Sequence, residues 1–155
     1  MTRRWVAAAG LAAGVLVSAT PAAAQHRTFG VRAGVSAEPE QFFFGGHVET
    51  KPVLDRLTFK PSAELGIGND VTLLALNVEF AYQIPIEDQP FKLYIGGGPA
   101  ANIYSVDGPG SSDGGVRGGF NFFVGVQHNK GLFLELKVGA VDSPSLKFMI
   151  GYVLK

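Results

Sequence analysis

Residues 146–155 read LKFMIGYVLK, a pattern that points to one class of fold. Successive side chains of a β-strand point to opposite faces, so the odd and even positions of this stretch separate. One face is entirely apolar and consists of Leu146, Phe148, Ile150, Tyr152 and Leu154. The other face is mixed and carries two lysines. The stretch is therefore predicted to be a strand with one side in apolar surroundings.

The same alternation recurs along the rest of the chain, and turn-forming residues separate the alternating segments. No segment after Gln25 shows a helical period, because glycine or proline interrupts each candidate window. Eight strands are predicted, at residues 28–36, 41–50, 56–68, 71–83, 91–104, 118–127, 132–140 and 146–154. The predicted fold class is all-β, an eight-stranded antiparallel up-and-down barrel.

The first 24 residues have the features of a signal peptide. Arg3 and Arg4 form a positive start, residues 6–17 are apolar, and the small residues 22–24 precede Gln25. The apolar run is too short for a transmembrane helix, which needs about 20 residues. We therefore expect a signal peptide at 1–24 and a barrel domain at 25–155.

Composition excludes several classes of function. The chain of 155 residues has 13 basic and 13 acidic residues, so it lacks the positive excess typical of nucleic-acid binding. It has no cysteine, which excludes disulfides and thiolate metal sites. No cofactor is expected.

A hairpin turn at residues 69–70 would fix the register of the third and fourth strands. Leu65 would face Leu74, Phe59 would face Phe80, and Leu57 would face Tyr82. On the other face Lys60 would lie opposite Glu79, which predicts an ion pair between them. Pro61 and Pro99 lack the backbone N–H that a ladder needs, so local breaks are expected there.

The polar faces of the strands combine charge with many glycines. A lumen charge network is predicted from Arg32, Lys60, Glu64, Glu79, Lys92, Glu135, Lys137 and Lys147. Glycine weakens an open surface strand but suits the inner wall of a narrow barrel, which favours apolar side chains facing lipid. The alternative is a soluble periplasmic barrel that binds a lipid or other apolar ligand inside an apolar lumen.

The export signal, the eight alternating strands and the ending Gly151-Tyr152-Val153-Leu154 together resemble a known family. Over residues 28–155 the chain is similar to the small bacterial outer-membrane barrels of the OmpX, opacity-protein and OmpA-transmembrane-domain type. The resemblance implies an outer-membrane location, contact with outer-membrane lipid, and help from periplasmic chaperones and the barrel-assembly machinery during biogenesis. It makes Phe148, Ile150, Tyr152 and Leu154 the assembly signal, although this family usually ends on an aromatic residue rather than on Lys155.

The same topology makes residues 105–116 the longest external loop, because this segment is rich in Gly, Ser and Asp. The candidate contact residues for an external partner, whose identity the sequence does not name, are Ser105, Asp107, Ser111, Ser112 and Asp113.

Catalysis is not expected. The outer-membrane lipid A deacylases pair a histidine with a serine two residues later, whereas His128 is followed by Asn129 and Lys130. A lipid A-modifying enzyme therefore remains a minor alternative. Bulky residues on the polar face predict a plugged lumen rather than an open pore, and with it a structural or surface-interaction role; they are Phe43, Tyr94, Phe123 and Phe133.

Overall fold

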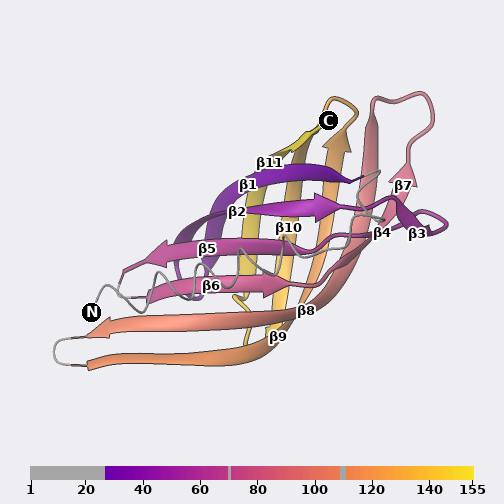
Figure 1. Ribbon diagram of the computed structural model, residues 1–155. Helices are drawn as coiled ribbons and strands as arrows, with labels where there is room; N and C mark the ends of the chain where they lie inside the picture. Colours follow the sequence, from indigo (N-terminus) through magenta and orange to yellow (C-terminus); the bar gives the residue numbers. More distant parts are fainter. Residues whose placement is uncertain (1–26, 70, 109–110) are drawn as a thin grey trace.

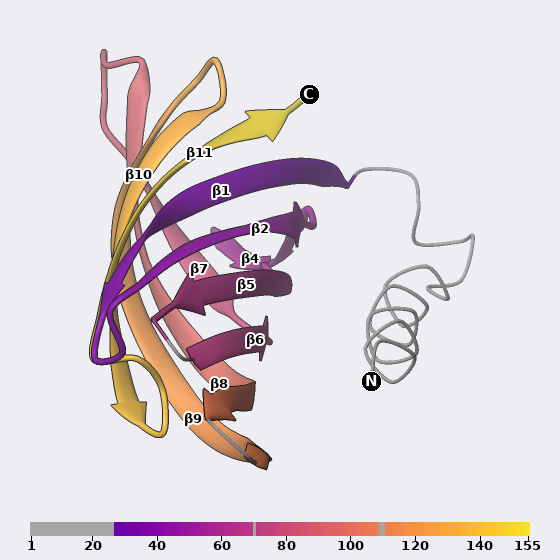
Figure 2. The ribbon, with the colours of Figure 1, turned by 90° about the vertical axis from the view of Figure 1, so that its left-hand side faces the viewer.

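The computed structural model describes residues 27–69, 71–108 and 111–155, which form a closed antiparallel barrel (Figures 1 and 2). The predicted signal peptide lies outside the described residues. The strands are β1 (Thr28–Ala37), β2 (Gln41–Glu49), β3 (Pro52–Leu54), β4 (Leu57–Phe59), β5 (Ser62–Gly68), β6 (Val71–Asn77), β7 (Phe80–Pro85), β8 (Phe91–Gly108), β9 (Ser111–His128), β10 (Leu132–Val141) and β11 (Leu146–Leu154). No helix in these residues is long and apolar enough to cross a membrane, a finding that does not bear on crossing by strands.

Pairing between β1 and β11 and between β8 and β9 closes the barrel. The predicted last strand pairs with β1 from Phe29↔Leu154 to Ala37↔Leu146 and with β10 on its other side. We call the end of the barrel where β1 begins and β11 ends the terminal end. The opposite end, which carries the connections from β1 to β2 and from β10 to β11, is the hairpin end.

The third and fourth strands of the barrel are each interrupted. The third strand consists of β4 and β5, and the fourth consists of β6 and β7. Pro61 lies between β4 and β5, which confirms the break predicted there. At Pro99 the outcome differs, because β8 continues through this residue and the break falls on the facing strand at Val78 and Glu79. The N–H of Val78 donates to the Pro99 carbonyl at 2.9 Å, so the two strands stay joined there.

The register predicted for this hairpin is confirmed. Leu65 pairs with Leu74, Phe59 with Phe80 and Leu57 with Tyr82. The backbone N–H of Lys60 donates to the Glu79 carbonyl at 2.8 Å, so these two residues are cross-strand neighbours. Of the predicted turn, Asp70 lies outside the described residues.

The apolar face of every strand points outward. None of its positions is buried, and Val124, for example, is 47% exposed and Phe148 51% exposed. The interior instead holds the polar face, together with Phe43, Tyr94, Phe133 and Met149. The alternative of an apolar ligand chamber lined by the apolar face is therefore wrong, because those side chains lie on the outside of the barrel.

Two strand predictions are corrected by the structure. Residues 105–116 are not a loop, because β8 and β9 continue as a paired ribbon to Gly108↔Ser111, beyond the tips of the neighbouring strands (Figure 1). The Gly- and Ser-rich composition suggested a turn, but a two-stranded ribbon is held by backbone hydrogen bonds that do not need large side chains. Similarly, residues 51–55, which the predicted strands leave as a connection, contain β3, which forms a short hairpin with β4.

Glycine makes room for interior rings on the inner wall, as Gly125 shows. A Cβ on Gly125 would collide with the Tyr94 ring and lie 2.8 Å from the Leu134 carbonyl oxygen. We expect Gly125→Ala to lower the free energy of unfolding by about 1–3 kcal/mol, the usual cost of overpacking. The measurement is denaturant unfolding of the purified barrel, followed by circular dichroism.

Gly115 on the same strand provides the matched control, because a Cβ there meets nothing within 4 Å. Gly115→Ala is expected to change stability by less than about 0.5 kcal/mol. Equal losses for the two variants would contradict a role of Gly125 in making room for Tyr94.

Candidate functional site: the charged lumen

Charged side chains from strands all around the barrel meet in its interior. We call the following eight residues the lumen network: Arg32, Glu49, Lys60, Glu64, Glu79, Glu135, Lys137 and Lys147. All eight are buried, and they comprise four cations and four carboxylates. Buried charges are costly unless they are paired. The equal numbers of cations and carboxylates therefore allow eight charged side chains to be enclosed in the lumen.

Glu64 on β5 contacts three cations of the lumen network. Its Oε2 accepts a hydrogen bond from Lys147 Nζ at 2.6 Å, and its Oε1 lies 3.2 Å from Arg32 Nη1 and 3.4 Å from Lys137 Nζ. These three cations come from β11, β1 and β10, which lie on the other side of β2 from β5. Glu64 thus connects the two sides of the barrel through its lumen.

Lys60 and Glu79 do not form the predicted ion pair. Lys60 Nζ lies 3.2 Å from Glu135 and 3.6 Å from Glu49, whereas Glu79 accepts from Lys137 Nζ at 2.7 Å. The register places Lys60 and Glu79 correctly, but in so narrow a lumen long side chains also reach strands on the far wall. Partners across the lumen therefore compete with cross-strand neighbours.

Aromatic rings and amides occupy the remaining space. Lys60 Nζ lies 4.5 Å from the centroid of the Tyr94 ring, and the Tyr94 hydroxyl donates to Glu135 Oε2 at 2.8 Å. Lys147 Nζ lies 4.9 Å from the centroid of the Phe43 ring. Such cation–π contacts are worth more when the cation is desolvated, as it is here. Asn121 donates to Glu79 Oε1 at 3.2 Å and extends the cluster toward the hairpin end.

The sequence predicts Lys92 as a member of the charge network in the lumen, but in the structure Lys92 lies outside the lumen network. It lies near the terminal end at the start of β8, half-buried, and no carboxylate of the described residues is within 4.0 Å of its Nζ. The predicted set omitted Glu49, which pairs with Lys60, and His47, whose Nε2 lies 3.3 Å from Glu49. Both have the parity of the polar face, which is the signal that could have identified them.

The candidate contact residues of the hairpin end lie in the paired ribbon of β8 and β9. Ser105 and Asp107 belong to β8, and Ser111, Ser112 and Asp113 belong to β9. Ser105 is only 7% exposed. The ribbon contacts the turn between β10 and β11, because the Tyr104 hydroxyl donates to the Asp142 carbonyl at 2.9 Å and Arg117 lies 3.8 Å from the Asp142 carboxylate.

Two solved structures resemble this barrel over most of its length. The N-terminal β-barrel domain of Pseudomonas aeruginosa OprF matches with a TM-score of 0.65 and 10% identity, covering 83% of this chain and 96% of that one. Neisserial surface protein A matches with a TM-score of 0.61 and 15% identity, covering 83% of this chain and 95% of the other. The protein has the fold of the small outer-membrane β-barrels of the OmpA and OmpX type. No family model and no curated protein matches the chain.

In this outer-membrane-type barrel, the predicted assembly residues lie on the outer face of β11. They are between 44% and 53% exposed: Phe148, Ile150, Tyr152 and Leu154. The ammonium of Lys155, the departure from the family's usual ending, donates to the Asn129 carbonyl in the adjacent turn.

The histidines of the barrel have partners that differ from those of a hydrolase dyad. His128 Nδ1 accepts a hydrogen bond from the backbone N–H of Lys130 at 3.0 Å, within the turn after β9. His47 Nδ1 accepts from Arg32 Nε at 3.3 Å. Among the described residues, no group of three or more His, Cys, Asp or Glu side chains is arranged to hold a metal ion.

Proposed function

We propose that the protein resides in the outer membrane as an integral barrel, without enzymatic activity, and serves a structural or surface-interaction role. One observation carries this proposal: the side chains are sorted, with apolar residues outside and paired charges inside. In water, an exposed belt of Phe, Leu, Val and Ile around a charged core would be an aggregation hazard. In a bilayer, the same arrangement gives each face its preferred surroundings.

The lumen is proposed to be plugged rather than open. Eight strands leave an interior just wide enough for side chains, and here the lumen network and the rings of Phe43, Tyr94, Phe123 and Phe133 lie within it. A solute would have to separate ion pairs such as Lys137–Glu79, at 2.7 Å, in order to pass. We therefore expect negligible conduction.

The ribbon of β8 and β9 is the proposed site of external contact, in a topology that places the hairpin end outside the cell. It extends past the pairing of β9 with β10, which stops at Val141↔Gly119. Two exposed valines lie near the base of this extension, Val116 at 71% and Val141 at 84%. Outer-membrane lipid surrounds the barrel in this proposal, and chaperones and assembly machinery act on the outer face of β11 during biogenesis.

The proposal predicts two properties of the barrel obtained by expressing the full chain. It should stay with membranes through a carbonate wash, and in detergent it should migrate differently on a gel before and after boiling, because the closed barrel resists the detergent until heated. Reconstituted into planar bilayers, it should give no stable channel of large conductance. Release by carbonate without a heat shift would contradict membrane residence, and sustained large currents would contradict the plug.

A further inference from the structure

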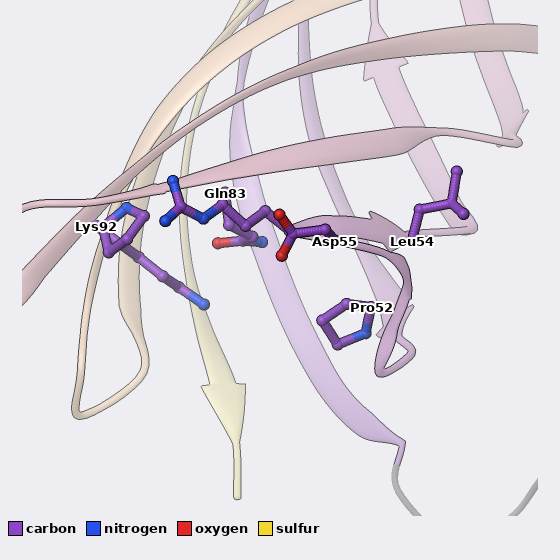
Figure 3. Close-up of a pocket in the computed structure, with 7 residues that line it drawn as sticks. Pro52, Leu54, Asp55, Gln83 and Lys92 are labelled. Atoms are coloured by element: carbon purple, nitrogen blue, oxygen red, sulfur yellow. The ribbon is translucent and has the colours of Figure 1, made fainter.

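A cleft of about 480 Å³ opens at the terminal end, between the β3–β4 hairpin and the ends of β7 and β8. Seven residues line it: Pro52, Leu54, Asp55, Arg56, Gln83, Pro85 and Lys92. Figure 3 shows Lys92 extending from one side of the cleft, with Pro52, Leu54 and Asp55 on the other. Its volume is in the range of small-molecule sites.

The positive charges of this cleft lack the carboxylate partners that the lumen network provides to its own cations. Neither Lys92 nor Arg56 has a carboxylate of the described residues within 4.0 Å. Lys92 is half-buried, and nearby Lys60 and Lys155 repel it. Glu49 opposes this repulsion, but it already contacts Lys60 at 3.6 Å and His47 at 3.3 Å. Asp55 is the one carboxylate among the lining residues, against the two cations Arg56 and Lys92, so the cleft keeps a net positive charge that favours an anion.

Gln83 adds a second, independent feature. Its side-chain Oε1 is buried and accepts no hydrogen bond within the described part of the chain. The Gln83 backbone is fixed, because its N–H donates to the Arg56 carbonyl at 2.7 Å and ties β7 to the turn before β4. A donor on a bound molecule would satisfy this acceptor once the Gln83 amide turns toward the cleft that its side chain lines.

The rest of the wall is apolar. Pro52, Leu54 and Pro85 are exposed, Leu54 at 69%, so a ligand that covered them would remove apolar surface from water. The Asp55 carboxylate also faces this space and would accept a further hydrogen bond from a donor on the ligand.

We propose that this cleft binds a small organic anion. Its negative group lies between Lys92 and Arg56, and its apolar part covers Pro52, Leu54 and Pro85. A donor on the ligand meets Gln83 Oε1 after the Gln83 amide turns toward the cleft. A carboxylate and a phosphate ester share this chemistry. The site is separate from the lumen network, and its ligand does not depend on whether the lumen conducts.

The test is a titration of the barrel, purified after expression of the full chain, in micelles of an uncharged sugar detergent. The probes are N-acetyl-leucine, its uncharged amide, and phenyl phosphate. Binding of each probe is measured from the backbone NMR shifts of the protein, at low and at high salt. We expect at least one anionic probe to shift resonances of the β3–β4 hairpin, with binding weakened by salt. Lys92→Gln should weaken this binding about tenfold, the effect of losing roughly one charge-assisted contact.

Lys51→Gln provides the matched control, because Lys51 is an exposed lysine immediately before β3 and does not line the cleft. It should bind like the unsubstituted protein, and the heat shift on gels checks that both variants fold. Binding of N-acetyl-leucine alone would support a carboxylate ligand, and binding of phenyl phosphate alone a phosphate ligand. The proposal is overturned if no anion binds, if the amide binds as tightly, or if Lys92→Gln has no effect beyond that of Lys51→Gln.

Discussion

Glu64→Gln is expected to lower the free energy of unfolding by about 3–5 kcal/mol, the typical cost of removing one partner from a buried ion pair. Glu64 is 1% exposed and lies within 3.4 Å of three cations, Lys147, Arg32 and Lys137. Neutralising it leaves an excess of positive charge inside the barrel, where water cannot screen it. Unfolding in denaturant, followed by loss of the heat-modifiable gel band, measures the effect.

A second substitution should restore part of this loss. Lys147 has Glu64 as its one carboxylate partner within 4.0 Å among the described residues. The double variant Glu64→Gln with Lys147→Met removes one charge of each sign, so it should be more stable than Glu64→Gln alone. Glu87→Gln, at an exposed position in the turn after β7, should change stability by less than about 0.5 kcal/mol. A double variant less stable than Glu64→Gln would refute the charge-balance explanation.

Val124→Arg is expected to destabilise the barrel in lipid by about 2–4 kcal/mol, the cost measured for a charge on the lipid-facing side of a barrel near the bilayer midplane. Val124 points outward from β9, in the middle of the apolar belt, and pairs with Ile95 and Leu136. The substitution removes no interior contact, so the whole effect should come from the surrounding hydrocarbon. Reversible unfolding from lipid vesicles measures it.

Val116, on the same strand and the same face, provides the comparison. It is 71% exposed and lies on the ribbon beyond the pairing with β10. Val116→Arg should therefore cost less than about 1 kcal/mol, as is found near or beyond the interface. If Val124→Arg and Val116→Arg had equally small effects, the proposal that the belt of Val124 faces lipid would be wrong.

The faces of the strands could be predicted from the sequence because alternation is a local property. The alternation in residues 146–155 predicted the strand that the structure shows as β11. The glycines and charges of the polar faces predicted that the apolar sides face outward, and an assumed turn at residues 69–70 predicted the register of Leu65 with Leu74. Pro61 gave a correct break for the same reason, since the missing N–H belongs to the residue itself.

The contacts inside the lumen could not be predicted in the same way. The alternation predicts that Lys60, Glu79 and Lys137 face inward. Their ion-pair partners, however, depend on the diameter of the barrel and on which residues of the opposite wall lie at the same level along the barrel axis. Glu79 therefore pairs with Lys137 from β10, and Lys60 with Glu135. Lys92 has the correct face but lies too near the terminal end to meet the lumen network.

The pairing of β11 with both β1 and β10 bears on the timing of assembly. In hydrocarbon, a barrel without this strand would expose two rows of unpaired backbone groups, each costing several kcal/mol. Closure must therefore wait until β11 has been synthesised and delivered, because β1 and β10 have no other bridge between them in the described residues. A chain cut short before β11 would remain an open sheet with unpaired backbone groups at both edges. Only a chain that includes β11 can therefore close into a barrel that is stable in hydrocarbon.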